Sequence, residues 1–176
     1  MPVIAIGGTF SYGYPAGSGP RYTVVNGAWH ITATTVAMAS PQYWVVGIYF
    51  NGNAAGTDCI DATAFTGVKF DIAGSITGTG CSAQYATADS AHLDNAMDPK
   101  GTGDATNYAP QAALNVVATA QTIMMPFNGA AGPSGGSPAV GVDKSKLTGV
   151  QWQFTTAAGG TSNCLVDITI DNVQFY

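Results

Sequence analysis

Short runs in which apolar and polar residues alternate make up much of this sequence, and Gly, Asn, Asp and Pro separate them. In one such run, Val68, Phe70 and Ile72 lie two positions apart with polar residues between them. Side chains of a β-strand point alternately to its two faces, so this spacing predicts a strand with one buried face. We expect strands at residues 22–25, 28–35, 43–51, 67–73, 81–87, 122–127 and 165–175, and another that contains Val150, Trp152 and Phe154.

Turn signals join these strands into an all-β fold. The dipeptide Asn26-Gly27 predicts a two-residue hairpin turn between the first two strands. No segment has a clear helical period, and the best helix candidate, residues 112–120, is interpreted equally well as a strand. Short strands at this spacing are typical of an antiparallel β-sandwich or a barrel.

The length of the chain, 176 residues, suits one compact core better than two. We find no internal repeat and no linker, so we expect a single domain over residues 1–176, with residues 1–20 as a candidate for a loosely attached segment. Two long loops are expected, at residues 87–111 and at the Gly-, Pro- and Ser-rich residues 128–140. Long loops of this kind often carry function.

The charged residues agree with the strand pattern. They form 9% of the chain, against about 25% in an ordinary soluble domain. All ten acidic residues are Asp and none is Glu, and Asp favours turns where Glu favours helices. The net charge of −5 and a pI near 4.4 argue against nucleic acid as a partner.

No stretch approaches the ~20 apolar residues that a membrane span needs. The apolar start, residues 1–6, is too short for a signal peptide and lacks its positive flank. If the protein is exported, we therefore expect that a leader has been removed or that the domain belongs to a longer chain.

Three cysteines are present, Cys59, Cys81 and Cys164, without the Cys-x-x-Cys spacing of a zinc site. Cys59 and Cys81 flank one expected strand, and a disulfide between them would stabilise the fold by roughly 3 kcal/mol. We favour this pair, with Cys164 unpaired. The alternative is three buried thiols that pack as small apolar side chains.

The expected strand at residues 43–51 has a candidate binding face. Its alternation places Trp44 and its neighbours in the core and Tyr43, Gly47 and Tyr49 on the other face. Aromatic rings beside a glycine suit the close approach of a ligand. The alternative is an outer face on which the tyrosines only cover a neighbouring strand.

Polar residues elsewhere could complete such a face. Gln151 and Gln153 alternate with the core positions of their strand, of which Trp152 is one, and two amides one pleat apart can bind neighbouring hydroxyls. One of Gln84 and Tyr85 must face away from the core, while His92 and Asp94 could rim a cleft, although a loop histidine is usually solvated. The candidate ligand-binding residues are thus Tyr43, Tyr49, Gln84, Tyr85, His92, Asp94, Gln151 and Gln153.

Evidence for catalysis is thin. The sequence has no Gly-x-Ser-x-Gly or His-Glu-x-x-His motif, and nothing in the spacing of the aspartates selects a carboxylate pair for glycoside hydrolysis. We assign no catalytic residue and expect a protein that is not itself an enzyme. A lyase that uses Tyr49, Tyr85 or His92 as a base is the remaining catalytic alternative.

Three strand phrases resemble those of a known group. Asp-Ala-Thr-Ala-Phe-Thr-Gly-Val-Lys-Phe (residues 61–70), Leu-Thr-Gly-Val-Gln-Trp-Gln-Phe (147–154) and Ile-Thr-Ile-Asp-Asn-Val-Gln-Phe (168–175) are similar, in order and spacing, to phrases of jelly-roll domains in secreted bacterial polysaccharide-active proteins. The nearest named relatives are family 11 carbohydrate-binding modules. The resemblance implies a galactose-binding-like, two-sheet β-jelly roll, an extracellular location and sugars that lie across the open face of one sheet.

The same resemblance implies a structural calcium ion. Asp171 beside Asn172 matches the place where the relatives hold such an ion, and Gly7-Gly8-Thr9 could add carbonyl ligands. The alternative is that Asp171 only caps a turn.

These observations predict a non-catalytic module that binds a polysaccharide, either a β-glucan or another plant or microbial glycan. The sequence lacks an obvious series of exposed tryptophans, which argues against a flat crystalline cellulose surface as the ligand. The first alternative is a structural subunit of an extracellular assembly or fibre, which would self-associate by strand addition through residues 3–6. The second is a small polysaccharide lyase or glycoside hydrolase.

Overall fold

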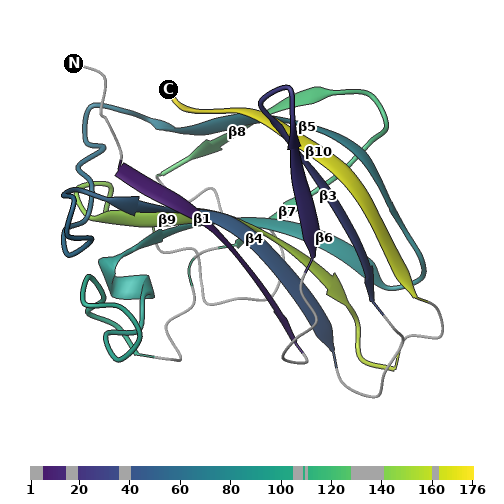
Figure 1. The fold of residues 1–176 in the computed structure, drawn as a ribbon, viewed down its shortest axis with the longest axis horizontal. Coiled ribbons are helices and arrows are strands. Elements are labelled where there is room, and N and C mark those ends of the chain that lie inside the picture. The colour runs from purple at the N-terminus through teal and green to yellow at the C-terminus, as the bar shows by residue number, and fades with distance from the viewer. Residues whose placement is uncertain are drawn as a thin grey trace.

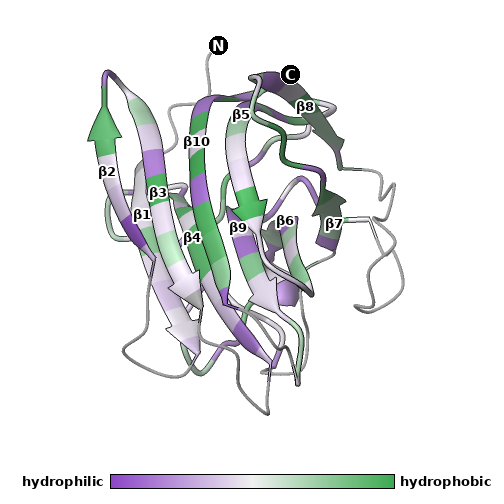
Figure 2. Ribbon diagram, turned by 90° about the vertical axis from the view of Figure 1, so that its right-hand side faces the viewer, coloured by the Kyte–Doolittle hydropathy of each residue, from purple (hydrophilic) through white to green (hydrophobic). Residues whose placement is uncertain are grey.

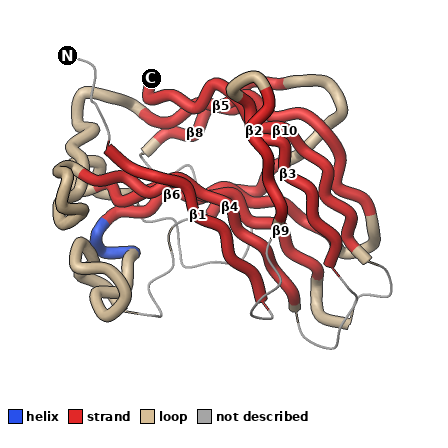
Figure 3. The backbone as a smooth tube through the Cα atoms, in the orientation of Figure 1, coloured by secondary structure: helices blue, strands red, loops and turns tan. Residues whose placement is uncertain are grey.

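The computed structural model of this chain describes residues 6–14, 20–35, 41–104, 109, 111–127, 141–159 and 163–176. Within these residues, strands and one short 3-10 helix, Ser90–His92, are the regular elements (Figures 1 and 3). The strands are β1 (Ile6–Tyr14), β2 (Arg21–Val25), β3 (Ala28–Thr35), β4 (Gln42–Asn51), β5 (Gly67–Thr77), β6 (Cys81–Asp89), β7 (Gln111–Leu114), β8 (Gln121–Pro126), β9 (Leu147–Thr156) and β10 (Cys164–Phe175).

These strands form two antiparallel five-stranded sheets, as the sequence predicts. Sheet A has the order β1-β4-β9-β6-β7, and sheet B has the order β2-β3-β10-β5-β8. In Figure 2, sheet B lies in front, and apolar and polar bands alternate along β3, β10 and β5. Each sheet thus has one apolar face that packs against the other sheet and one outer face.

Aromatic side chains fill the centre of the sandwich. The ring of Trp152, which is fully buried, lies 5.2 Å from that of Phe70 and 5.7 Å from that of Tyr85. Phe70 comes from sheet B and the other two from sheet A, so this contact joins the two layers. The predicted alternation holds here, and replacing a buried Trp with Ala typically costs about 3–5 kcal/mol.

The hairpin between β2 and β3 has the predicted two-residue turn. Asn26 and Gly27 have φ values of 53° and 87°. Both angles lie in the left-handed region, as a type I′ turn requires, and Gly and Asn adopt it at the least cost.

Two expectations about segments are wrong in part. Residues 6–14 are not loosely attached, because β1 pairs with β4 along its whole length and forms an edge of sheet A. In residues 112–120 the strand ends at Leu114, and the part that follows has no regular structure. The predicted loop at residues 128–140 lies outside the described residues.

The predicted disulfide is also wrong. Cys81 bonds to Cys164, with a Cα–Cα distance of 5.7 Å, and Cys59 is a free thiol. Cys81 begins β6 in sheet A and Cys164 begins β10 in sheet B, so the bond ties the two sheets together at one end. The partners are 83 positions apart in sequence, and only the packing of the sheets brings them together.

Among the residues described, no helix has the length and apolar character needed to cross a membrane.

Candidate functional site

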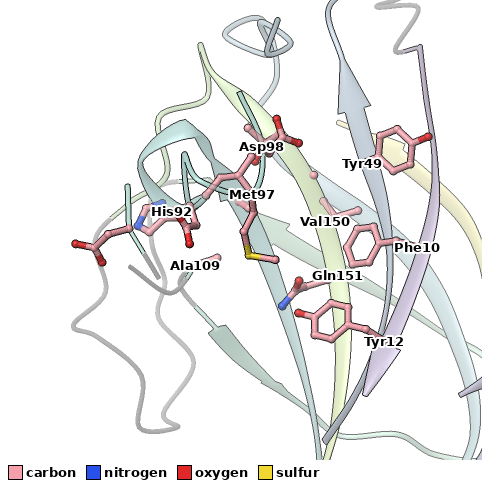
Figure 4. A pocket seen from close by; sticks show the side chains of 15 residues that line it. Phe10, Tyr12, Tyr49, His92, Met97, Asp98, Ala109, Val150 and Gln151 are labelled. Carbon is pink, nitrogen blue, oxygen red and sulfur yellow. The ribbon is translucent and has the colours of Figure 1, made fainter. Parts of the chain in front are cut away.

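A groove of about 480 Å³ crosses the outer face of sheet A (Figure 4). Its base comes from β9 and the end of β6, at Thr148, Gly149, Val150, Gln151 and Ala88. Rings from β1 and β4 form one side. The opposite side is formed by the segment that follows β6, which includes His92, Leu93, Asp94, Met97, Asp98 and Asp104.

Aromatic rings line the first side. In Figure 4, the rings of Tyr49, Phe10 and Tyr12 follow one another along this side, opposite His92 and Met97. The Phe10 and Tyr12 rings are nearly parallel, with 6.0 Å between centroids and 16° between planes. Tyr12 and Tyr49 are 46% and 39% exposed, which leaves ring surface available to a ligand.

Two more aromatic side chains continue this line of rings past the groove. Tyr43 lies edge-on to Tyr12, with 6.4 Å between ring centroids, and is stacked with Tyr14 at 5.9 Å. Tyr14 is 49% exposed. We call Phe10, Tyr12, Tyr14, Tyr43 and Tyr49 the aromatic row.

A buried carboxylate orients His92 on the opposite side. Asp89, at the end of β6, is only 2% exposed, and its Oδ1 accepts hydrogen bonds from the His92 ring Nδ1 (2.6 Å) and from the backbone of Ala91 and His92. Its Oδ2 accepts from the backbone N–H of Asp143. A histidine held in this way has a defined ring orientation, unlike the solvated loop histidine that its sequence context suggests.

A buried lysine fixes the same side of the groove. The Lys100 side chain is 4% exposed, and its Nζ donates to Asn51 Oδ1 (2.9 Å), to the Gly56 carbonyl (3.3 Å) and to Asp98 Oδ2 (3.1 Å). These contacts attach the groove-lining loop to the turn after β4. The Asp98 carboxylate is thereby held at the rim rather than left to move with the loop.

The structure brings together seven of the eight predicted ligand-binding residues. Four of them, Tyr49, His92, Asp94 and Gln151, line the groove. Tyr43, Gln84 and Gln153 lie beside it on the same outer face of sheet A, where the strand register places Gln84 opposite Gln153 and Gln153 opposite Val45.

Tyr85 is the exception, and its prediction as a ligand residue is wrong. It is 3% exposed and packs in the core against Phe70 and Trp152. Its hydroxyl accepts a hydrogen bond from Thr87 Oγ1 at 2.9 Å, and burial raises the pKa of the phenol. The alternation of β6 turns Gln84 outward and Tyr85 inward.

Sequence reasoning missed Phe10, Tyr12 and Tyr14. They occupy every second position of β1, so they share the outer face with Tyr43 and Tyr49 of β4. That spacing of aromatics is a strand signal in itself, although glycines interrupt it. Lys100 and Asp98 carried no signal, because a charged residue in a loop is usually solvated.

The predicted calcium ligand Asp171 lies on the outer face of sheet B, directly opposite Asp71. Hydrogen bonds already engage both carboxylates: Asn172 donates its backbone N–H to Asp171 (2.7 Å) and its side-chain amide to Asp71 (2.7 Å), and Thr122 also donates to Asp71. Calcium takes six to eight oxygen ligands.

No three His, Cys, Asp or Glu side chains among the described residues lie close enough together to hold a metal ion. Gly7, Gly8 and Thr9 border a separate hollow of about 410 Å³ together with Asp171 and Asn172, and Asp171 is the one carboxylate among its described lining residues. This donor set falls short of a calcium cage. A calcium ion at Asp171 stays a prediction, which the effect of calcium and of a chelator on thermal unfolding would test.

Comparison with known proteins gives a shared fold. No protein-family model matches the chain, and no curated protein matches its sequence. A family 11 carbohydrate-binding module from Clostridium thermocellum, solved in complex with a β-1,3-1,4-mixed-linked tetrasaccharide, superposes with a TM-score of 0.56 and 16% identity over 95% of this chain and 87% of that one.

Two further modules have lower scores. A family 30 module of a Clostridium thermocellum cellulosomal cellulase has a TM-score of 0.45 and 13% identity, over 98% of this chain and 95% of that one. A xylan-binding module from Roseburia intestinalis has a TM-score of 0.34 and 12% identity, over 96% of each chain. The family 11 module alone carries the conclusion: at 16% identity its superposition establishes the fold, and the predicted likeness to the family 11 jelly roll is confirmed at that level.

Proposed function

We propose that this chain is a non-catalytic carbohydrate-binding module that binds a polysaccharide, a β-glucan or another plant or microbial glycan, across the outer face of sheet A. One observation carries the proposal. A single groove has exposed aromatic rings along one side and polar groups, held in defined positions, along the other.

The two sides suit the two kinds of surface that a sugar presents. The faces of a pyranose ring carry C–H groups that pack on aromatic rings, while its edges carry hydroxyls. The rings of Tyr12 and Tyr49 supply the first kind of contact. Gln151, His92 and Asp98 supply amide, imidazole and carboxylate groups for the hydroxyls.

The groove favours a single glycan chain over a flat crystalline surface. The polar loop stands opposite the aromatic row (Figure 4), so a ligand must enter between the two sides. Tyr43, Gln84 and Gln153 extend the same face beyond the groove, which gives room for several sugar units. The family 11 module of similar fold was solved with a tetrasaccharide, which supports a ligand of this length and class.

Affinity electrophoresis against soluble β-glucan, xylan, mannan and pectin tests the proposal. We expect retardation on at least one polysaccharide, and we expect Tyr12→Ala to reduce it. Leu165→Ala is the matched control, because Leu165 is an exposed apolar residue (52%) on the outer face of sheet B. Migration unaffected by every polysaccharide would overturn the proposal.

An extracellular location is part of the same proposal. The Cys81–Cys164 disulfide supports it, because such bonds persist in oxidising compartments. The alternatives have their own tests. Release of reducing sugar or of unsaturated product would indicate an enzyme, and concentration-dependent assembly in size-exclusion chromatography would favour a structural subunit.

A further inference from the structure

Two glycines face two rings of the aromatic row across the β1–β4 strand pair. Phe10 of β1 lies directly opposite Gly47 of β4, and Tyr49 of β4 lies directly opposite Gly8 of β1. The two pairs are adjacent on the outer face of sheet A. In one pair the ring belongs to β1 and the glycine to β4, and in the other pair the ring belongs to β4 and the glycine to β1.

The Phe10 ring occupies the space of a missing side chain at position 47. A Cβ built on Gly47 would lie 2.2 Å from Phe10 Cζ and 2.6 Å from Cε1, and 2.7 Å from the carbonyl oxygen of Val150. The far end of the ring therefore lies over β4, where a Cβ atom of residue 47 would be. No residue other than glycine leaves this space.

Tyr49 has the same relation to Gly8. A Cβ on Gly8 would lie 2.4 Å from the Tyr49 hydroxyl oxygen, 2.6 Å from Cζ and 2.8 Å from Cε1. The three atoms nearest to a Cβ on Gly8 thus all belong to the far end of the Tyr49 side chain, which can turn away. Gly8 differs here from Gly47, whose Cβ would also meet the backbone.

We propose that Gly8 and Gly47 are positioning residues for ligand binding, because they allow the rings of Tyr49 and Phe10 to lie flat along one side of the groove. This inference rests on the proposed function. A side chain at either position lifts the ring from the sheet, so that the ring narrows the groove and presents its edge instead of its face. The glycines thus set both the width of the groove and the orientation in which a sugar can stack.

The test is a double-mutant cycle with soluble mixed-linkage β-1,3-1,4-glucan as the probe. We expect Gly8→Ala to raise the dissociation constant roughly tenfold, about the loss of one stacking contact, with little change in thermal stability. In a Tyr49→Ala background the same Gly8→Ala change should alter affinity less than about twofold, because no ring is left to displace. Gly47→Ala and Phe10→Ala form the second cycle.

Ser11→Ala is the control, because Ser11 lies on β1 with its side chain on the opposite face. A ligand-free readout accompanies the cycle: ring currents should shift the Gly8 Hα resonances of the wild-type protein, and Tyr49→Ala should abolish that shift. Unchanged affinity of Gly8→Ala, or an equal loss with and without Tyr49, would overturn the inference alone. If the wild-type protein binds no polysaccharide of the panel, the proposed function and the inference both fall.

Discussion

Tyr12 on β1 is hydrogen-bonded to Gln151 on β9, although β4 runs between these two strands. The phenol ring must therefore cross β4, and Val45, the residue opposite Tyr12, has no exposed surface even though it points away from the core. Burial and the neighbouring Tyr43 raise the pKa of the Tyr12 phenol, which stays neutral and able to hydrogen-bond. Tyr12 thus covers the sheet and orients an amide of the groove.

This arrangement predicts different effects for two substitutions of Tyr12. Tyr12→Ala removes the stacking ring and should raise the dissociation constant for a bound glycan roughly tenfold. Tyr12→Phe keeps the ring and loses only the hydrogen bond to Gln151, which costs about 1 kcal/mol of folding stability and should raise the dissociation constant less than about threefold. Isothermal titration calorimetry measures both, and equal losses for the two variants would show that the ring face does not contact the ligand.

Much of the fold follows from alternation that is visible in the sequence. Val68, Phe70 and Ile72 are buried as their spacing predicts, and the Asn26-Gly27 turn has the predicted geometry. β1 was missed because its glycines and serine lower the strand propensity of the segment, and its pairing with β4 supplies the missing stability. Pairing of distant strands is a tertiary property that local patterns do not contain.

The site was predictable to the extent that it lies on strands. The outward positions of β4 and β9 follow from the period of two, so Tyr49 and Gln151 could be placed from sequence. The side of the groove formed by the loop could not be predicted from sequence, because the contacts of Lys100 with Asn51 and Gly56 join segments more than forty residues apart. The same applies to the Cys81–Cys164 bond, since cysteine spacing leaves the pairing open.

The buried Lys100 predicts a link between stability and binding. Lys100→Met keeps the aliphatic volume but leaves Asn51, Gly56 and Asp98 without their donor. We expect a loss of about 2 kcal/mol of unfolding free energy, below the ~3–5 kcal/mol of a fully buried ion pair because Asp98 is partly solvated. Urea unfolding of the wild type and of Lys100→Met measures this loss of unfolding free energy.

Glycan affinity should fall as well in Lys100→Met, since the loop that carries Asp98 loses its attachment. Lys146→Met, at an exposed position, is the control and should change stability by less than about 0.5 kcal/mol. Equal effects of the two lysine substitutions would contradict this role for Lys100.

The disulfide should contribute strongly to stability because it closes a long segment. The paired cysteines are 83 positions apart, for which the chain-entropy model gives about 4.5 kcal/mol. We expect the double variant Cys81→Ala, Cys164→Ala to unfold at correspondingly lower urea, and Cys59→Ala to have a small effect. Alkylation before reduction should label Cys59 alone, and labelling of Cys164 would show that the bond is absent.

Asp71 predicts a component of acid sensitivity. Hydrogen bonds from Thr122 and Asn172 lower its pKa below the ordinary value of 3.8. A carboxylate whose pKa is lower in the folded state stabilises the fold above the unfolded value, and this contribution is lost as pH falls through the folded value. The thermal unfolding temperature should thus fall less steeply with pH below 3.8 in Asp71→Asn than in the wild type. Equal slopes of unfolding temperature against pH in the two proteins would contradict this role of Asp71.

The charge of the groove predicts a preference for neutral polysaccharides. Asp94, Asp98 and Asp104 line it, and its described lining contains no Lys or Arg. Asp98 forms a salt bridge with Lys100. A polyuronate brought into this groove would be repelled, over a distance of about 10 Å at moderate ionic strength.

We therefore expect retardation by a neutral β-glucan and none by polygalacturonate at low salt. The double variant Asp94→Asn, Asp104→Asn should reduce this discrimination, and added salt should do the same without changing affinity for the neutral chain. Tighter binding of polygalacturonate than of the neutral glucan at low salt would contradict the prediction, because an acidic groove without a bound cation cannot favour an acidic polymer.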